Sequence, residues 1–300
     1  MILKIKLLFI LIIFSFSVAA LDENFYKRYL TPLNKNIQRG HAKKIEFKWP
    51  LTWSEPSISC LGKKILIGVK EKKIDHLVYY GFVSISYNTK IKKFNCQLLS
   101  QDHHGKKISQ TFLRFSLVPF KAKIQILNVP KKMVDLSSKD LKRYQKEKKR
   151  LQQIFSHPDI KRKFVLGQFQ LPLNSVVTSP YGWKRIFNDK KNSWHKGVDF
   201  RAAVGTLIPS GLAGKVVLAQ DLFFNGKTVI IDHGQSVYTL YCHLSEIKVK
   251  EGQEIGQGAT IGLSGNTGRS NGPHLHWGVK VMDHWVDGVS FIAETQMSGS

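Results

Sequence analysis

The alternation of apolar and polar positions indicates β-strands along much of the N-terminal half. Between residues 51 and 130, segments such as KKILIGVK, LVYYGFVSISYNT, KKFNCQLLS and KAKIQILNV alternate or cluster β-branched and aromatic residues between turn residues. Strands at this spacing predict a small sandwich or a barrel. Residues 22–50 are polar with scattered apolar anchors, and Pro32 and Pro50 argue against a long element there.

A helical period replaces this pattern at residues 135–163. Ser137, with Asp140 three residues later, resembles a capping box, and Pro158 ends the pattern. Apolar residues recur between them at near-helical spacing, with lysines and arginines at the other positions; they are Leu141, Tyr144, Leu151, Ile154 and Phe155. We predict a basic helix that links the two halves of the chain. Its charges form either a solvated face or a surface that binds an anionic wall or membrane.

From Gly167 onward the pattern is β again and rich in glycine. GKVVLAQ and KTVIIDHG flank Asn225-Gly226, a strong hairpin signal, and SVYTLYCHL, TIGLSG and HLHWGVKV follow as further strands. No helix of length is evident after about residue 165. We therefore predict a mainly β protein whose C-terminal half is one mostly antiparallel β domain.

The first twenty residues have the three-part pattern of a secretory signal. Lys4 and Lys6 precede an apolar run, and the small residues Val18, Ala19 and Ala20 precede the expected cut. An uncleaved membrane anchor is the alternative, although the run is short for a span. The predicted organisation is a signal peptide at 1–20, a β domain at 21–130, a basic helical linker at 131–164 and a second β domain at 165–295.

The charge balance of the chain limits the kinds of partner that we expect it to bind. Lysines and arginines number 46 against 21 aspartates and glutamates, which gives a formal net charge of +25. Such a protein is drawn to polyanions. With either a cleaved signal peptide or an uncleaved anchor, we expect the rest of the chain to be exported, to the periplasm or to the cell exterior and wall. We therefore expect no nucleic-acid partner and favour an acidic wall polymer or a membrane surface.

The cysteines have structural interpretations. Cys60 and Cys96 lie in one β-rich region, so they can form a disulfide in an oxidising compartment. Cys242 stands between apolar residues in LYCHL, which predicts a small buried side chain rather than a nucleophile. Isolated histidines are predicted to be structural or exposed residues rather than ligands, and His233 in IDHGQ is predicted to be a turn residue.

Three short pieces of the C-terminal half hold residues that can bind and use a metal ion. HKGVDF sets His195 and Asp199 on one side of an extended segment, HLHWG does the same for His274 and His276, and YCHLS ends a strand with His243. Zinc catalysis needs three protein ligands, an open position, a proton acceptor and a group that offsets developing negative charge. His195, Asp199 and one histidine of the HxH pair are the candidate ligands. The other histidine of the pair and His243 are the candidate assistants.

These pieces resemble the successive motifs of the lysostaphin-type (LytM-like) zinc metallopeptidases. VTSPYGWKR, HKGVDFRAAVGT, GKVVLAQDLFFNGKTVIIDHG, YTLYCHLS and GLSGNTGRSNGPHLHWGV occur in the family's order over about residues 165–292. The resemblance implies an antiparallel β-sheet peptidase domain that holds Zn²⁺ and cuts peptide bonds of peptidoglycan, in stem cross-links or glycine bridges. The N-terminal β region and basic helix resemble, more loosely, the Ig-like N-terminal part of some secreted members.

The resemblance also implies a role for each candidate residue. His195, Asp199 and His276 match the metal ligands, His274 matches the general base, and His243 matches the histidine that stabilises the oxyanion. We therefore expect a secreted zinc endopeptidase acting on peptidoglycan peptide stems or cross-bridges. The alternative is a non-catalytic wall-binding regulator of other peptidoglycan hydrolases, since some relatives have lost ligands and act as activators.

Two further hypotheses concern other parts of the chain. VKEGQEIGQGATIG resembles the hairpin of lipoyl or biotinyl carrier domains, but it has no lysine at the tight turn between its strands, and export also disfavours a carrier. The N-terminal region can cover the substrate groove and keep the enzyme latent, a hypothesis that follows only from the two-part layout.

Overall fold

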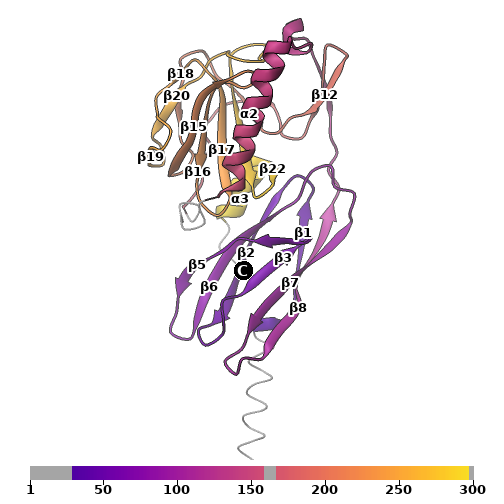
Figure 1. Cartoon of the computed structure of the whole chain (residues 1–300), viewed down its shortest axis with the longest axis vertical. Coiled ribbons are helices and arrows are strands. Elements are labelled where there is room, and N and C mark those ends of the chain that lie inside the picture. Colours follow the sequence, from indigo (N-terminus) through magenta and orange to yellow (C-terminus); the bar gives the residue numbers. More distant parts are fainter. Residues whose placement is uncertain (1–28, 159–166, 297–300) are drawn as a thin grey trace, which may run out of the picture.

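The computed structural model describes residues 29–158 and 167–296, so the predicted signal peptide lies outside the described residues. The chain forms two β-rich parts, one at each end of the molecule, and helix α2 (Ser138–Ser156) runs beside the C-terminal part (Figure 1). This mainly β architecture confirms the predicted fold class. None of the helices in these two ranges combines the length and apolar character that crossing a membrane requires.

Two small sheets form a sandwich in the N-terminal part. The first sheet has the order β1 (Leu33–Gln38), β8 (Lys107–Val118), β7 (Lys93–Gln101), β3 (Ser57–Cys60) and β4 (Lys63–Ile65). The second has the order β2 (Ala42–Pro50), β6 (His76–Ser84) and β5 (Ile67–Lys72). Buried side chains of both sheets share one core, because alternate residues of strands such as β7 face inward.

The expectation that residues 22–50 hold no long element is wrong. Strand β2 is nine residues long and buries Ile45, Phe47 and Trp49 on one face. It lies at the edge of its sheet and pairs with β6 alone. Pro50 is tolerated because it stands at the last position of an edge strand, where a missing N–H group disrupts little.

A disulfide joins Cys60 and Cys96, the pair that the sequence allowed. The two residues face each other directly in the antiparallel ladder of β3 and β7, with their Cα atoms 4.2 Å apart. Both cysteines are buried in the sandwich core. Cys242 is a free, fully buried thiol, as predicted.

The C-terminal part is built on a large antiparallel sheet. Its order is β10 (Val177–Ser179), β13 (Val198–Arg201), β21 (His274–Val281), β17 (Val237–Leu244), β16 (Gly226–Asp232), β15 (Gly214–Leu222) and β19 (Glu254–Ile255), and β22 (His284–Val286) also pairs with β21. A smaller sheet has the order β14 (Leu207–Pro209), β20 (Thr260–Leu263) and β18 (Glu246–Ile247). One face of the large sheet buries Trp277, Tyr241 and Phe200 in the main core. Asp199 and His276, which alternate with core residues along their strands, lie on the opposite face.

The two parts of the chain pack against each other. Tyr80 and Phe82 of the N-terminal sandwich belong to the same buried cluster as Val281 of the large sheet. The hydroxyl of Ser84 donates a hydrogen bond to the carbonyl oxygen of Val281 at 2.8 Å. The sandwich is thus joined to the large sheet by buried contacts as well as by the chain.

Helix α2 is more than a solvated linker. It begins where the sequence predicts, because the hydroxyl of Ser137 accepts a hydrogen bond from the backbone N–H of Asp140. Its apolar residues Leu151, Ile154 and Phe155 pack on a buried cluster of the large sheet. That cluster contains Leu218, Leu222, Ile230, Tyr238, Leu240 and Cys242. The helix therefore covers part of the sheet face opposite the main core.

A buried carboxylate fixes α2 to the turn that follows β15. Glu147 accepts hydrogen bonds from the backbone N–H of Phe223, at 3.0 and 3.2 Å, and from Nε of Arg143 at 2.7 Å. Glu147→Ala should lower the free energy of unfolding by about 1–3 kcal/mol, because it leaves a buried N–H group without an acceptor. Urea denaturation of the purified chain measures this. Glu147→Gln keeps an acceptor oxygen and should lose less; equal losses would contradict the explanation.

Two elements depart from the predicted organisation. A short helix, α3 (Gly288–Gln296), follows the last strand, and it was missed because nine residues show too little periodicity. Strand β9 (Ile124–Leu127) was expected to belong to the N-terminal domain. It pairs in parallel with β11 (Lys184–Phe187), which pairs with β12 (Lys191–Trp194), and so forms a three-stranded sheet beside the C-terminal part. A 3₁₀ turn, η1 (Lys131–Met133), connects β9 to α2.

Candidate metal centre

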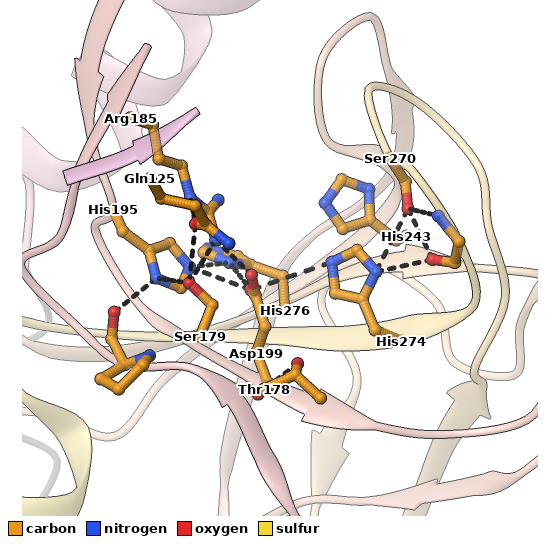
Figure 2. A network of polar contacts seen from close by, with 12 residues as sticks. Gln125, Thr178, Ser179, Arg185, His195, Asp199, His243, Ser270, His274 and His276 are labelled. Carbon is orange, nitrogen blue, oxygen red and sulfur yellow. Dashed lines mark hydrogen bonds and ion pairs between the residues drawn. The ribbon is translucent and has the colours of Figure 1, made fainter. Parts of the chain in front are cut away.

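Two histidines and one aspartate meet on the face of the large sheet that lies opposite the main core. Asp199 of β13 and His276 of β21 are directly paired in the antiparallel ladder, and His195 lies just before β13. Nε2 of His195 lies 2.9 Å from Oδ1 of Asp199 and 3.0 Å from Nδ1 of His276, and that Nδ1 lies 2.7 Å from the same Oδ1 (Figure 2). The structure thus brings the three predicted ligands together.

Local contacts orient the ring of His195 toward this point. Its Nδ1 donates a hydrogen bond to the carbonyl oxygen of Pro180 at 2.7 Å, so Nε2 keeps its lone pair for a ligand. Gly197 is needed for the close approach of the chain, because a Cβ there would lie 2.4 Å from the carbonyl oxygen of Trp277 and 2.8 Å from the His276 ring. The spacing of HKGVD therefore serves both the ligands and the packing between them.

The protonation states of the cluster suit a cation. Burial lowers the pKa of His195 to about 4, with partial opposition from Asp199. Burial acts to raise the pKa of Asp199, but its contacts with His195 and His276 hold that pKa well below the usual range. The neutral imidazole of His195, the ionised carboxylate of Asp199 and the imidazole of His276 therefore meet at one point. These donors, all within 4.8 Å of one another, fit a zinc-type ion.

Arg185 of β11 is a partner of the cluster that the sequence analysis missed. Its guanidinium contacts Oδ2 of Asp199, donates to the hydroxyl of Ser179 at 2.9 Å, and donates to the side-chain oxygen of Gln125 at 3.2 Å (Figure 2). Gln125 comes from β9, far from the motif region in sequence. Although Arg185 lies in the quoted segment VTSPYGWKR, no periodic or ligand-spacing signal separates it from the many other cations of the chain.

His274 lies beside the cluster without sharing its central point. Its Nδ1 donates to the carbonyl oxygen of Gly272 at 2.8 Å and lies 3.1 Å from the hydroxyl of Ser270. Its Nε2 is therefore the acceptor nitrogen, and it lies 3.8 Å from Oδ1 of Asp199. A ring held in this way presents a lone pair to whatever occupies the space next to the three candidate ligands.

His243 is held in a left-handed backbone conformation at the end of β17. Its φ angle is 61°, which is uncommon for a residue with a Cβ and is often found at functional sites. Nδ1 donates to the carbonyl oxygen of Thr267 at 2.7 Å, and the ring centroid lies 4.8 Å from that of His274. In the neutral ring Nε2 is an acceptor, so His243 can donate to an oxyanion only as an imidazolium.

These residues lie in a cleft of about 660 Å³ with walls from several parts of the chain. One wall comes from α2, which contributes Tyr144, Lys148, Gln152 and other residues, and β9 contributes Gln125 and Leu127. The sequence motifs do not include these segments, because their approach to the cleft depends on long-range packing. Helix α2 thus lines the cleft. That the N-terminal region keeps the enzyme latent stays a prediction.

His233 lies where the sequence predicts and has a structural role. It follows β16 near a turn and is fully buried. Nδ1 donates to the carbonyl oxygen of Ala213 and Nε2 lies 2.7 Å from the hydroxyl of Thr239. Its hydrogen bonds support the core of the large sheet, outside the cleft.

Comparison with known proteins places the motif region in a family. Residues 193–288 match Peptidase family M23. The chain is 34% identical to the peptidoglycan DD-endopeptidase ShyA of Vibrio cholerae serotype O1 over 155 residues, which are 51% of this chain and 34% of ShyA. It is 35% identical to the DD-carboxypeptidase/endopeptidase Mpg of Neisseria meningitidis serogroup B over 121 residues, which are 40% of this chain and 27% of Mpg.

A solved structure extends the similarity beyond the motif region. A peptidase M23 protein from Pseudomonas aeruginosa superimposes with a TM-score of 0.61 at 28% identity, over 90% of this chain and 99% of that one. The curated relatives, in contrast, are matched over only about a third of their length or less. The chain therefore carries a peptidase domain of family M23, homologous to that of the peptidoglycan DD-endopeptidase ShyA.

Proposed function

We propose that this protein is a secreted, zinc-dependent endopeptidase that hydrolyses the peptide cross-links of peptidoglycan. The observation that carries the proposal is the convergence of His195, Asp199 and His276 at one point, with His274 and His243 beside them in one cleft. The homology to peptidoglycan endopeptidases supports the substrate class. Two imidazoles and a carboxylate are a donor set typical of catalytic zinc sites, which favours this ion over others.

The residues of the cleft divide the work of peptide hydrolysis between them. His195, Asp199 and His276 would hold the ion, which when bound supplies Lewis acidity and an activated water molecule near neutral pH. Nε2 of His274 is placed to accept a proton, and the hydrogen bond to Gly272 stabilises the imidazolium that results. Burial lowers the pKa of His243 to about 3, so the ring is neutral before the reaction; a proton passed on by the neighbouring His274 would let its Nε2 donate to the oxygen that becomes negative, and Thr267 holds its ring in place.

Arg185 holds the aspartate in its orientation. Its guanidinium engages Oδ2 of Asp199, which leaves Oδ1 for the ligand cluster. Removing this cation would allow the carboxylate to rotate and would weaken ion binding, as outer partners of metal ligands generally do. Arg185 is thus a positioning residue in this proposal, without contact to the peptide.

Product analysis tests the proposed function directly. Purified protein incubated with peptidoglycan should release new peptide ends, seen by mass spectrometry of the soluble fragments. Treatment with a chelator should abolish the release and added Zn²⁺ should restore it, because the ion is held by three protein ligands only. Protein isolated from outside the cytoplasm is expected to begin at Leu21, because the signal peptide predicted at 1–20 would have been removed. A protein that binds the wall but releases no new peptide ends would instead be the regulator considered above.

A further inference from the structure

Cationic side chains line the cleft in excess of acidic ones. Lys148, Arg185, Lys196 and Arg269 contribute to its walls, whereas Asp199 is the one carboxylate among the described residues that line it. Arg185 is engaged with Asp199. The other three form no ion pair with any residue in the ranges 29–158 and 167–296. This charge attracts an anionic ligand to the cleft.

The guanidinium of Arg269 lies between two aromatic rings. Its guanidinium carbon lies 4.2 Å from the ring centroid of Phe187, at the end of β11, and 4.3 Å from that of Phe224, in the turn after β15. Contact with ring faces leaves the N–H groups at the edge of the guanidinium plane free to donate. Among the described residues, none accepts a hydrogen bond from this side chain.

The loop that carries Arg269 is held rigidly next to the candidate catalytic histidines. The backbone N–H of Arg269 donates to the carbonyl oxygen of Phe224 at 2.8 Å. Gly268, with φ of 73°, packs so closely on Gly226 that a Cβ would lie 2.3 Å from the backbone nitrogen of that residue. The next residue, Ser270, contacts His274. The guanidinium is therefore placed before any substrate arrives, which reduces the entropic cost of binding.

The electrostatic environment of Arg269 also favours binding of an anion. Burial, together with the nearby cation of Arg185, lowers the pKa of Arg269 to about 10, so the group stays charged at neutral pH in surroundings that disfavour its charge. A bound carboxylate would relieve both effects. Planar guanidinium and carboxylate groups form two parallel hydrogen bonds, and this geometry distinguishes a carboxylate from other acceptors.

We propose that Arg269 binds a carboxylate group of the substrate peptide, and that the enzyme therefore selects cross-linked peptides with a free carboxylate near the bond that is cut. The inference rests on the proposed function and names a specificity determinant within it. Two sources share this chemistry: the carboxylate at the C-terminus of a stem peptide and the free carboxylate of an acidic residue within it. The experiment separates them by amidating each one alone.

The test compares three cross-linked muropeptides: the free acid, its C-terminal amide and its internal amide. For wild-type protein, amidation of the group that Arg269 binds should raise KM about 10- to 100-fold, since charge-assisted hydrogen bonds are lost. Arg269→Gln should raise KM for the free acid by a similar factor and should no longer distinguish the sensitive amide from the acid. Arg269→Lys, which keeps the charge without the fork, should fall between the two.

Matched controls separate binding from folding and from the proposed function. Arg114→Gln, on an exposed face of the N-terminal sandwich, should leave every KM unchanged. A general disturbance of the loop by Arg269→Gln would slow all three substrates equally, and that result would overturn the proposal. So would a wild-type protein that is indifferent to both amidations. If wild-type protein cleaves none of them, the proposed function fails, and calorimetric binding of acid and amides then decides the role of Arg269 alone.

Discussion

Asp199→Asn should abolish peptidoglycan hydrolysis and bound metal together. Asp199 supplies Oδ1 to both histidine contacts of the cluster, at 2.9 Å to His195 and 2.7 Å to His276. An asparagine keeps the shape but loses the negative charge that a divalent cation needs. Turnover should fall by about 10³-fold or more, because both the Lewis acid and the activated water are lost. Elemental analysis of the dialysed protein and muropeptide release measure the two effects.

The same substitution leaves Arg185 without its ionic partner, so loss of fold must be separated from loss of metal. The side chain of Arg185 is mostly buried, with 16% exposed, and an unpaired buried cation is strongly destabilising. His276→Ala removes a ligand without disturbing this ion pair, and it should lose metal and activity to the same extent. Asp189→Asn, in an exposed hairpin turn, is the matched control. Circular dichroism should show native folding for both ligand variants; a folded Asp199→Asn protein that retains one zinc per chain would refute the ligand assignment.

Short-range sequence patterns predicted which residues can meet in the ligand cluster, whereas the choice of His276 over His274 as the third ligand came from the family resemblance. A period of two placed His274 and His276 on one face of a strand, and the spacing of four in HKGVD placed His195 and Asp199 together. The ladder then pairs Asp199 with His276 directly. These relations depend on the regular geometry of extended chain, and so they can be predicted before the tertiary structure is known.

The walls of the cleft could not be predicted in this way. Arg185 reaches Asp199 because β11 folds over the sheet, and Gln125 reaches Arg185 because β9 crosses from the N-terminal part to pair with β11. Leu151 and Phe155 of α2 were predicted as an apolar helical face, but the surface they cover depends on packing between distant segments. Exposed charges such as Lys148 carry no periodic signal at all. The proposed specificity therefore depends on contacts that only the folded chain reveals.

His274→Ala should separate catalysis from metal binding. The imidazole presents Nε2 at 3.8 Å from Oδ1 of Asp199, farther than either ligand histidine, so its removal leaves the three candidate ligands in place. The variant should keep about one equivalent of zinc while turnover falls by about 10²- to 10⁴-fold, the usual contribution of a positioned proton acceptor. His104→Ala, in an exposed turn of the N-terminal sandwich, is the matched control and should retain full turnover.

The paired histidine makes this prediction sharper. His243 lies with its ring centroid 4.8 Å from that of His274, and its Nδ1 is likewise held by a backbone carbonyl. If His274 accepts the proton and His243 donates to the oxyanion, each single variant should lose turnover, and the double variant should lose less than the product of the two losses, because the residues act on one transition state. Wild-type turnover in His274→Ala would exclude it as the proton acceptor. Loss of zinc in the same variant would instead make it a fourth ligand.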